Sequence, residues 1–329
     1  MVISKTPLRI SFFGGGTDYP AWYKENGGAA LSATINKYSY LHIQRLPPFF
    51  PYKIKVAWSR LEEANHIDEI THPSVRETLR FLKLNDECLT IHYNGDLPAR
   101  SGMGSSSSFT VGLLHALYGL QGVIPDKKKL AEEAIHIEQN LIKENVGSQD
   151  QIAAAFGGLN KIDFHKDGDF VVAPIALTEA PLKKLQNHMM LFFSGFSRTA
   201  SLIAAEQIKN IPDKTKELHA MRRLVDEAID IIQNGAGDWP YEFGRLLHKT
   251  WELKRSLSSK ISNDAIDDFY ARALQAGALG GKLLGAGGGG FLLIYARPEN
   301  QERIKQALSE LLFVPFAFEH QGSQIIYKN

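Results

Sequence analysis

GDLPARSGMGSSSSFTVGLLHALYG, from Gly95 to Gly119, is the stretch that decides the fold of this chain. Its small residues run directly into an apolar stretch with helical spacing. Gly102 and Gly104 allow positive φ angles and close backbone approach, and four successive serines follow them. Such a junction directs free backbone amides at an anion, and its hydroxyls can bind phosphate or complete a Mg²⁺ shell. The segment therefore predicts a phosphate-binding loop before a helix, although a flexible, serine-capped polar loop has the same composition.

Two further glycine-rich segments lie near the ends of the chain, PLRISFFGGGTDYP (7–20) and KLLGAGGGGFLLIYA (282–296). The second contains G-x-G-x-x-G, beginning at Gly285. In a dinucleotide-binding fold these glycines follow a strand and open a helix. Here a helical stretch (264–278) precedes them and a strand-like run (291–296) follows. The P-loop pattern is missing too, since no lysine follows the glycines of the serine-rich loop. Together the three segments indicate phosphoryl transfer at a nucleotide site of another type.

Length and composition narrow the class of protein. A chain of 329 residues suits two domains of ordinary size. Lys plus Arg total 37 against 36 for Asp plus Glu, so the overall charge provides no attraction to nucleic acid or an anionic membrane. The single cysteine, Cys88, excludes an internal disulfide and a multi-cysteine zinc site. MVISKTPLRI lacks the apolar core of a signal peptide, and no apolar run approaches the ~20 residues that span a bilayer. We expect a soluble, cytoplasmic protein with a small-molecule partner.

The pattern along the chain predicts an α+β protein with a domain boundary near residue 186. Strand-like runs in the first half are 39–46, 53–58, 89–94 and 169–175, and helical runs follow Ser105, Asp126 and Ser148. From residue 187 onward we predict a strand (HMMLFFSG), several helices between 198 and 278, the strand FLLIYA, a helix over 299–311, and the strands VPFAFE and QIIY. The predicted domains are 1–186 and 187–329.

Two acidic residues have unusual settings. Glu138 is the only charge in the helical row Ala131, Ile135, Glu138, Ile142. A carboxylate in an apolar row needs a cation, a hydrogen-bond network or a cleft wall, unless it reaches water at the margin of the row. Asp150 lies in SQDQ, which has the form of a capping box and precedes IAAAF. This places Asp150 in the first turn of a short helix, where an acid can also serve only to complement the helix dipole.

The order P-x-R-x-x-x-x-G-x-x-T-D-Y, then P-x-x-x-G-M-G-S-S-S, then G-A-G-G-G-G resembles the GHMP small-molecule kinases, named after galacto-, homoserine, mevalonate and phosphomevalonate kinases. The resemblance spans nearly the whole chain. It implies a first domain like domain 2 of ribosomal protein S5, a ferredoxin-like second domain, and ATP with Mg²⁺ in the cleft between them. Galactokinases carry G-E-H where this chain has Gly14, Gly15 and Gly16, so galactose itself is not the expected substrate.

The resemblance also implies roles for individual residues. Asp150 takes the place of the catalytic aspartate and Arg9 that of the catalytic cation, while Glu138 and Ser106 take the places of magnesium ligands. The implied nucleotide site is the loop Ser101, Gly102, Met103, Gly104, Ser105, Ser106 and Ser107. The implied substrate contacts are Asp18, Tyr19, Gly15, Gly16, Gly287 and Gly288. Arg198, directly after the predicted strand HMMLFFSG, is our candidate for binding a substrate phosphate, with Arg100 and Lys5 as further local cations.

Within the family, the first two motifs and VGSQDQ are most similar to kinases of D-glycero-D-manno-heptose 7-phosphate. The expected reaction is ATP-dependent phosphorylation of the anomeric hydroxyl, which gives the 1,7-bisphosphate and serves the biosynthesis of nucleotide-activated heptose. A fucokinase-like activity on a free sugar is the alternative from the same class. A sensor that binds sugar and nucleotide without turnover is the alternative from another class, against which the presence of Glu138, Asp150 and Ser106 argues. The oligomeric state is not predicted.

Overall fold

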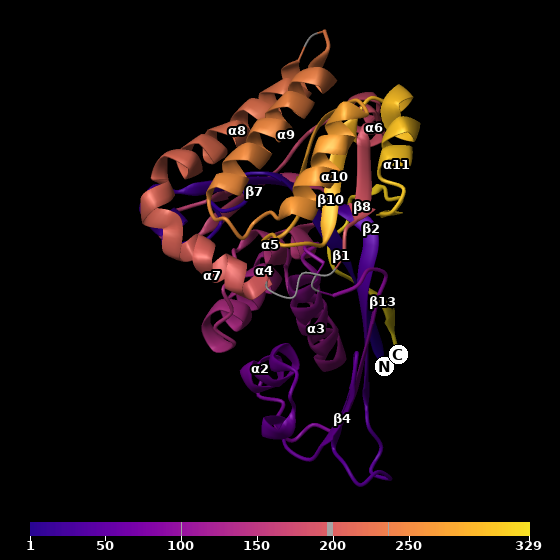
Figure 1. Ribbon diagram of the computed structural model, residues 1–329. Helices are drawn as coiled ribbons and strands as arrows, with labels where there is room; N and C mark the ends of the chain where they lie inside the picture. The colour runs from indigo at the N-terminus through magenta and orange to yellow at the C-terminus, as the bar shows by residue number, and fades with distance from the viewer. Residues whose placement is uncertain (100, 196–199, 236) are drawn as a thin grey trace.

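Two β-sheets form the framework of the molecule (Figure 1). The computed structural model describes residues 1–99, 101–195, 200–235 and 237–329. Among these residues, the strands of the larger sheet are β1 (Val2–Phe13), β2 (Gly28–Arg45), β3 (Ile54–Ala57), β4 (Leu61–Ala64), β5 (Leu89–Gly95), β6 (Leu159–Phe164), β7 (Phe170–Pro174), β12 (Phe318–Glu319) and β13 (Gln324–Lys328). Those of the smaller sheet are β8 (Met189–Phe193), β9 (Ala278–Leu283), β10 (Phe291–Ala296) and β11 (Leu312–Phe313).

Helices cover both sheets. They are α1 (Pro20–Asn26), α2 (Pro73–Phe81), α3 (Ser105–Gln121), α4 (Lys127–His136), α5 (Gln149–Phe156), α6 (Glu179–Asn187), α7 (Ala200–Asn210), α8 (Thr215–Asn234), α9 (Trp239–Ser256), α10 (Asp264–Gln275) and α11 (Gln301–Ala307). Short 3₁₀ turns occupy Ile67–Glu69, Ile211–Lys214 and Pro298–Asn300, and a π-helical turn, Ile137–Leu141, follows α4. Within the described ranges, no helix has both the length and the apolar character that crossing a membrane requires.

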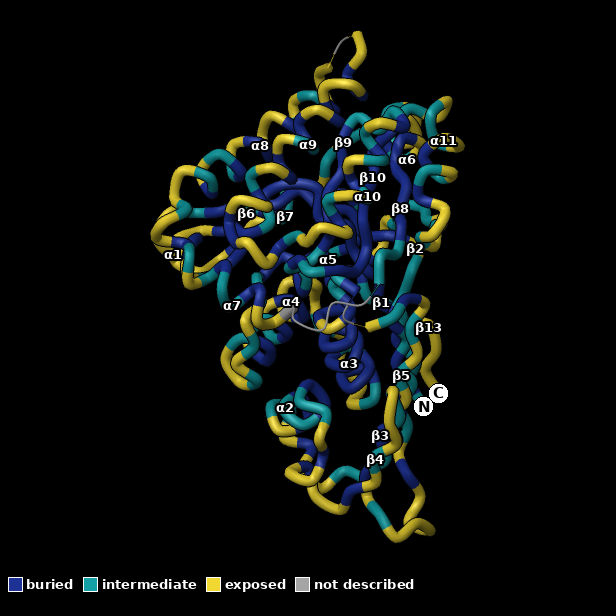
Figure 2. The backbone as a smooth tube through the Cα atoms, in the orientation of Figure 1, coloured by how far each residue is buried: buried dark blue, intermediate teal, exposed yellow. Residues whose placement is uncertain are grey.

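The long strand β2 organises the larger sheet. It pairs with β1 along most of its length, with β6 through its first part and with β5 through its last part. Helix α3 packs against β1 and β2 and is buried along nearly its whole length (Figure 2). This burial explains why the segment after the serine-rich loop is apolar on all sides. The predicted helix after Ser105 is confirmed, and its position fixes the glycine loop at one end of the sheet.

The smaller sheet has the ferredoxin-like arrangement. Its strand order is β11-β8-β10-β9, and all its pairs are antiparallel. Helices α7 to α10 lie between β8 and β9 in the chain, and α11 lies between β10 and β11, which gives the β-α-β-β-α-β pattern of that fold. The predicted two-domain α+β architecture is confirmed.

The last two strands return to the larger sheet. β13 pairs with β1, with Val2 opposite Lys328, and β12 pairs with β2, with Phe318 opposite Ile35. The boundary near residue 186 remains a prediction, and as a single cut it separates β12 and β13 from the sheet that they complete. The strand expected over VPFAFE is reduced to Phe318–Glu319, because Pro315 within it has no N–H to donate to a neighbouring strand.

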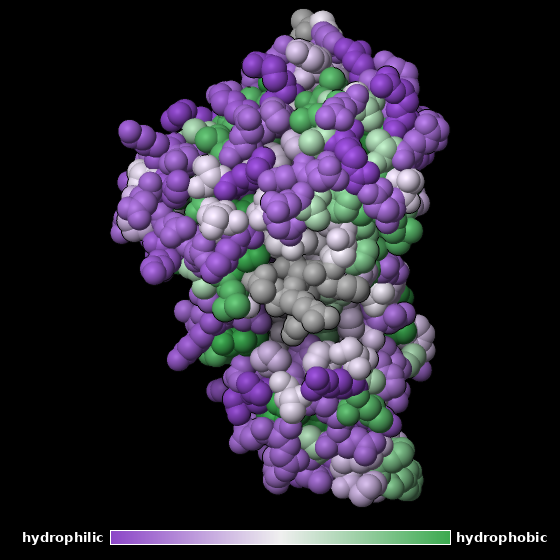
Figure 3. Space-filling view, in the orientation of Figure 1, coloured by the Kyte–Doolittle hydropathy of each residue, from purple (hydrophilic) through white to green (hydrophobic). Residues whose placement is uncertain are grey.

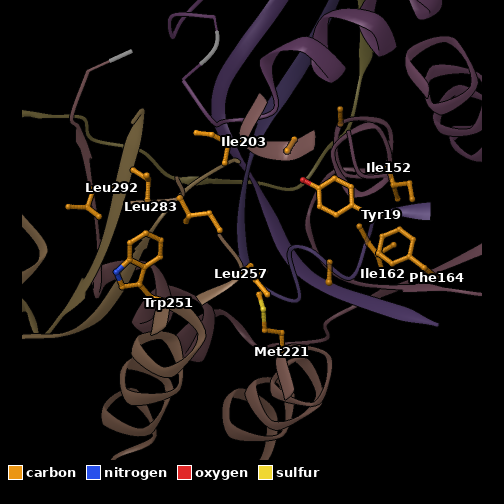
Figure 4. Close-up of a cluster of buried hydrophobic side chains, with 14 of the residues drawn as sticks. Tyr19, Ile152, Ile162, Phe164, Ile203, Met221, Trp251, Leu257, Leu283 and Leu292 are labelled. Carbon is orange, nitrogen blue, oxygen red and sulfur yellow. The ribbon is translucent and has the colours of Figure 1, made fainter. Parts of the chain in front are cut away.

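The largest hydrophobic cluster joins the two sheets. Figure 4 shows Tyr19 and Ile162 of the first part of the chain in the same cluster as Trp251, Leu257 and Leu283 of the second. All five side chains are buried. Hydrophilic residues, in contrast, dominate the face drawn in Figure 3. A shared core of this kind holds the side chains that the two sheets present to each other in a defined geometry.

Candidate active site

The serine-rich loop and the third glycine segment pack backbone against backbone. Gly102 and Gly104 have φ angles of 82° and 73°, and α3 begins immediately afterwards at Ser105. A Cβ on Gly102 would lie 2.5 Å from the carbonyl oxygen of Leu284, and one on Gly285 would lie 2.4 Å from the Cα of Gly102. Only glycine fits these positions. The contact holds the loop so that the first amides of α3, which have no acceptor within the helix, are available to an anion.

A cavity of about 600 Å³ lies at this junction. Residues of all three glycine-rich segments line it, together with residues from α5, α7 and α9. The sequence-predicted residues that it brings together are Arg9, Gly15, Gly16, Asp18, Tyr19, Gly102, Gly104, Ser105, Ser106, Ser107 and Asp150. Most of the residues predicted to bind nucleotide and substrate therefore line one space.

Arg9 of β1 and Asp150 of α5 form a two-point ion pair in this cavity. Arg9 Nε lies 2.7 Å from Asp150 Oδ1, and Arg9 Nη2 lies 2.6 Å from Asp150 Oδ2. Arg9 Nη1 donates to the carbonyl oxygen of Gly102 at 2.9 Å, which ties the pair to the glycine loop. Arg9 is buried, whereas Asp150 is partly exposed to the cavity. The two parallel contacts fix the orientation of the carboxylate, as a group that must meet a reacting hydroxyl requires.

The helix that carries Asp150 begins where expected but lacks the predicted capping box. Ser148 makes no side-chain cap to α5. Its hydroxyl instead lies 3.3 Å from the Tyr23 hydroxyl and accepts from Gln139 Nε2 at 3.0 Å. Gln151 Nε2 donates to Glu138. Distant polar partners have therefore replaced the local cap, while Asp150 retains its place in the first turn.

Asp18 is buried and held by the loops around it. Its Oδ1 accepts from the Gly16 amide at 2.8 Å, and its Oδ2 accepts from Gln149 Nε2 at 3.0 Å. Burial raises the pKa of Asp18, and the charge of Asp150 adds to this, while the Gly16 hydrogen bond opposes it. Burial likewise raises the pKa of the Tyr19 hydroxyl, which therefore remains a hydrogen-bond donor.

Glu138 is fully buried at the start of α3, in the π-helical turn rather than in a continued α-helix. Its oxygens accept from Thr110 Oγ1 at 2.8 Å, Ser107 Oγ at 2.8 Å and Gln151 Nε2 at 2.5 Å. Burial raises the pKa of Glu138 to about 7, although these hydrogen bonds oppose the shift. Two neighbouring serines at the start of α3 differ in their contacts. Ser107 donates a hydrogen bond to Glu138, whereas Ser106 is exposed and lines the cavity. The hydrogen-bond network was one of the settings that the sequence left open.

Other predicted residues lie away from the cavity lining. Ser101 and Met103 are buried residues of the loop and do not line the cavity. The carbonyl oxygen of Ser101 accepts from the Phe291 amide, and that of Met103 accepts from the Arg9 amide. Gly288 donates its amide to the carbonyl oxygen of Ile261. A Cβ on Gly287 would lie 2.7 Å from Ile261. Neither glycine lines the cavity, so this geometry does not support their assignment to the substrate. In their place the third segment presents Gly285 and Ala286. Arg198 and Arg100 lie outside the described residues.

Sequence reasoning missed two lysines. Lys254, in the last turn of α9, and Lys282, in β9, are both buried and both line the cavity. Lys282 could have been noticed as the one charge in the third glycine segment, where it opens the apolar run before the glycines. Lys254 has no such signal, because only the packing of α9 brings it to the cavity.

An aspartate–arginine pair that lies beside a helix N-terminus in one cavity is an arrangement suited to phosphoryl transfer. Two family models match the chain: the GHMP kinases N terminal domain over residues 73–158 and the GHMP kinases C terminal domain over residues 235–312. The chain belongs to the GHMP kinase family and is a kinase. ATP is the phosphoryl donor of this family.

Individual relatives match nearly the whole chain. The chain is 27% identical to D-glycero-alpha-D-manno-heptose 7-phosphate kinase of Campylobacter jejuni over 97% of both chains. It is 25% identical to L-fucokinase/L-fucose-1-P guanylyltransferase of Bacteroides fragilis, over 99% of this chain but 38% of that protein. Among solved structures, a D-glycero-D-manno-heptose 1-phosphate kinase of Bacteroides thetaiotaomicron has the same fold, with a TM-score of 0.81, 24% identity and full coverage of both chains.

Proposed function

We propose that this kinase phosphorylates the anomeric hydroxyl of D-glycero-D-manno-heptose 7-phosphate, which gives the 1,7-bisphosphate and ADP. The observation that carries the proposal is the Arg9–Asp150 pair, which lies beside the N-terminus of α3 in the same cavity as Asp18. The relative from Campylobacter jejuni supports the choice of sugar. A cytoplasmic location and a role in the biosynthesis of nucleotide-activated heptose are part of this proposal.

Each group has a part in the transfer. The first amides of α3 bind phosphate oxygens of ATP, and Asp18 with Tyr19 orients the sugar. The anomeric oxygen forms a bond to the γ-phosphorus as the bond from that phosphorus to the β,γ-bridging oxygen breaks. The proton of the hydroxyl passes to the Asp150 carboxylate, and ADP leaves. Arg9 offsets the negative charge around the reacting centre.

The proposal includes Mg²⁺. Glu138 and the serines at the start of α3 provide a carboxylate and hydroxyl oxygens, which are ligands that Mg²⁺ prefers. No cluster of three or more His, Cys, Asp or Glu side chains suited to a metal occurs among the described residues. The ion would therefore complete its shell with ATP oxygens and water, and its charge would help to neutralise the transferring group.

Room beside the first glycine segment favours a long substrate. A Cβ on Gly15 would meet only Gln149 Nε2 and Ser11 Oγ, each at 3.6 Å, which is ordinary contact distance. Galactokinases carry a glutamate at this point of the motif. Replacing a charged side chain by glycine leaves space for a sugar with an extended, phosphorylated end.

A screen with purified enzyme tests the proposal. ADP release is measured with ATP, Mg²⁺ and a panel of free and phosphorylated heptoses, fucose, galactose and mevalonate, and ³¹P NMR identifies the position of the new phosphate. The heptose 7-phosphate should have the highest kcat/KM and give an anomeric phosphate. Preference for fucose would favour the fucokinase-like alternative, for which the Bacteroides fragilis relative provides support. Sugar and ATP binding without ADP release would favour a sensor.

A further inference from the structure

We infer that Lys254 and Lys282 form a phosphate-binding site in the wall of the active cavity, and that its ligand is a phosphate group carried by the acceptor substrate. The choice of ligand and the kinetic test rest on the proposed function, whereas the anion site itself does not. Three observations carry it: the burial of both ammonium groups, their incomplete set of partners, and their position in the cavity wall between the first and third glycine segments.

Both lysines are almost completely withdrawn from water. The side chains are 5% and 2% exposed for Lys254 and Lys282. By comparison, Lys143 also lines the cavity, but its side chain is exposed and its charge is hydrated. A buried ammonium group loses its hydration, so it needs hydrogen-bond acceptors and a counter-charge in the protein or in a ligand.

The protein provides only part of what the two ammonium groups need. Lys254 Nζ donates to the carbonyl oxygens of Leu283 at 3.2 Å and Gly285 at 2.5 Å. Lys282 Nζ donates to the carbonyl oxygen of Phe12 at 3.0 Å. Each ammonium has three N–H donors, so within the described part of the chain one donor of Lys254 and two of Lys282 have no hydrogen-bond acceptor. Neither lysine forms an ion pair with a carboxylate in these parts of the chain.

The charges around the pair favour an anion. Burial lowers the pKa of Lys254 to about 8, with Arg9 acting in the same direction and the carboxylates of Asp18 and Asp150 opposing. Burial also lowers the pKa of Lys282 well below its usual value, and Lys254 and Arg9 add to this. The two carboxylates are already engaged, Asp150 by Arg9 and Asp18 by Gly16 and Gln149. A phosphate dianion would supply the missing counter-charge, and its oxygens would accept hydrogen bonds from the remaining N–H groups of the two lysines.

The position of the pair indicates the acceptor rather than ATP. Lys282 Nζ donates a hydrogen bond to the carbonyl oxygen of Phe12. Phe12 follows Ser11 and lies two residues before Gly14, the first of the three glycines of the first segment. The hydroxyl of Ser11 is buried there and has no hydrogen-bond partner among the described residues. The N-terminus of α3 already offers a separate anion site for the phosphates of ATP. The lysine pair would therefore provide a second anion site, which Lys282 ties to the first glycine segment and Lys254 ties to Gly285.

Kinetics of three lysine variants test the inference. Lys254→Met and Lys282→Met keep side-chain length and remove the charge, and Lys254→Arg keeps a charge. Lys249→Met alters an exposed lysine of the same helix and serves as the control. We expect each Met variant to lower kcat/KM for heptose 7-phosphate by about 10²-fold, with changes below about 3-fold in the KM for ATP and in kcat/KM for the unphosphorylated heptose. Lys254→Arg should retain most of the preference, and Lys249→Met should match the wild type.

Other outcomes would overturn the inference. A raised KM for ATP with equal losses on both sugars would assign the lysines to the nucleotide. Equal losses of kcat/KM on the phosphorylated and unphosphorylated heptose, together with a lowered Tm, would show that the two lysines have a structural role. If Lys254→Met does not fold, Lys282→Met provides the same comparison.

A second experiment separates this inference from the proposed function. Thermal unfolding is followed with inorganic phosphate in the presence of a saturating, non-hydrolysable ATP analogue, which occupies the site at α3. Phosphate should raise the Tm of the wild type and of Lys249→Met but not that of the Met variants. This difference would hold even if heptose 7-phosphate proved not to be the substrate. The same phosphate shift in all four proteins would contradict the lysine site.

Discussion

The Arg9 guanidinium and the Asp150 carboxylate meet through two parallel N–O contacts of 2.7 and 2.6 Å. Arg9 comes from β1 of the larger sheet and Asp150 from a helix 141 residues later in the chain. A parallel, two-point pair fixes the plane of the carboxylate as well as its charge. The aspartate is thereby oriented before any substrate arrives, which lowers the cost of aligning the reacting hydroxyl.

Asp150→Asn should lower kcat by about 10²-fold or more, because an amide cannot accept the proton of the sugar hydroxyl. The side chain keeps its size and one acceptor for Arg9, so the fold and the affinity for ATP should remain. Steady-state kinetics and nucleotide binding measure both effects. Asp264→Asn, which changes an exposed first-turn aspartate of α10, is the matched control. Near-normal turnover in Asp150→Asn would exclude this residue as the proton acceptor.

Glu138 should make the stability of the metal-free protein depend on pH. Its pKa is about 7 in the folded chain against 4.5 for an unperturbed glutamate, so the folded state binds more protons between these values. The stabilisation is complete below pH 4.5 and is lost as the pH rises through 7, with an amplitude on the order of 3 kcal/mol. Urea unfolding of the wild type and Glu138→Gln between pH 5 and 8 measures this. A constant difference between the two proteins would contradict the shift.

The same variant should also weaken the response to magnesium. Mg²⁺ prefers the ionised carboxylate, so Glu138→Gln removes the charged ligand and should raise the Mg²⁺ concentration at half-maximal activity by about 10-fold. The rise in Tm on adding Mg²⁺ should be larger at pH 8 than at pH 6 in the wild type and small in the variant. Unchanged titrations would show that the metal lies elsewhere.

Ser107→Ala and Ser106→Ala should differ in their effects. Ser107 donates to Glu138 at 2.8 Å, so its loss removes a hydrogen bond to the carboxylate and should change the Mg²⁺ requirement together with the Tm. Ser106 is exposed to the cavity, so its loss should act on the KM for ATP or on the Mg²⁺ requirement while the Tm stays within about 1 °C of the wild type. Differential scanning fluorimetry and Mg²⁺ titrations compare the two. Equal Tm losses would remove the distinction between the two serines.

Gly147→Ala should damage the sugar side of the cavity. Its Cβ would lie 1.8 Å from Asp18 Oδ2, so the carboxylate must move. We expect the KM for the sugar to rise by 10-fold or more and the free energy of unfolding to fall by about 1–3 kcal/mol, with little change in the KM for ATP. Gly122→Ala is the control: a Cβ there would meet nothing within 4 Å, but the φ angle of 80° strains an alanine, so this variant should lower stability without changing the KM for the sugar. An unchanged KM for the sugar would show that Asp18 does not contribute to sugar binding.

Local chemistry explains which elements the sequence could predict. Helix α3 and the strands β5, β7, β8 and β10 were expected, because their apolar runs have the length and period of buried elements. The long strand β2 was recognised only over its second part, since its first residues are small and alternate little. The helix after Asp126 was expected to reach Ile142, but it changes to a π-helical turn at Ile137. Nothing in the local pattern marks that change, which orients Glu138 toward the start of α3.

The sequence by itself determined the glycine loops, the helix that follows the serines, and the presence of Arg9, Asp18 and Asp150 at conspicuous places. These depend on short-range effects, such as the conformational freedom of glycine and the dipole of a helix start. Only the tertiary structure decided that Ser107 meets Glu138, that Gly285 rather than Gly287 lines the cavity, and that Lys254 lies buried beside it. Burial and partners of a side chain depend on segments that are distant in the chain, and a local pattern carries no information about how those segments pack.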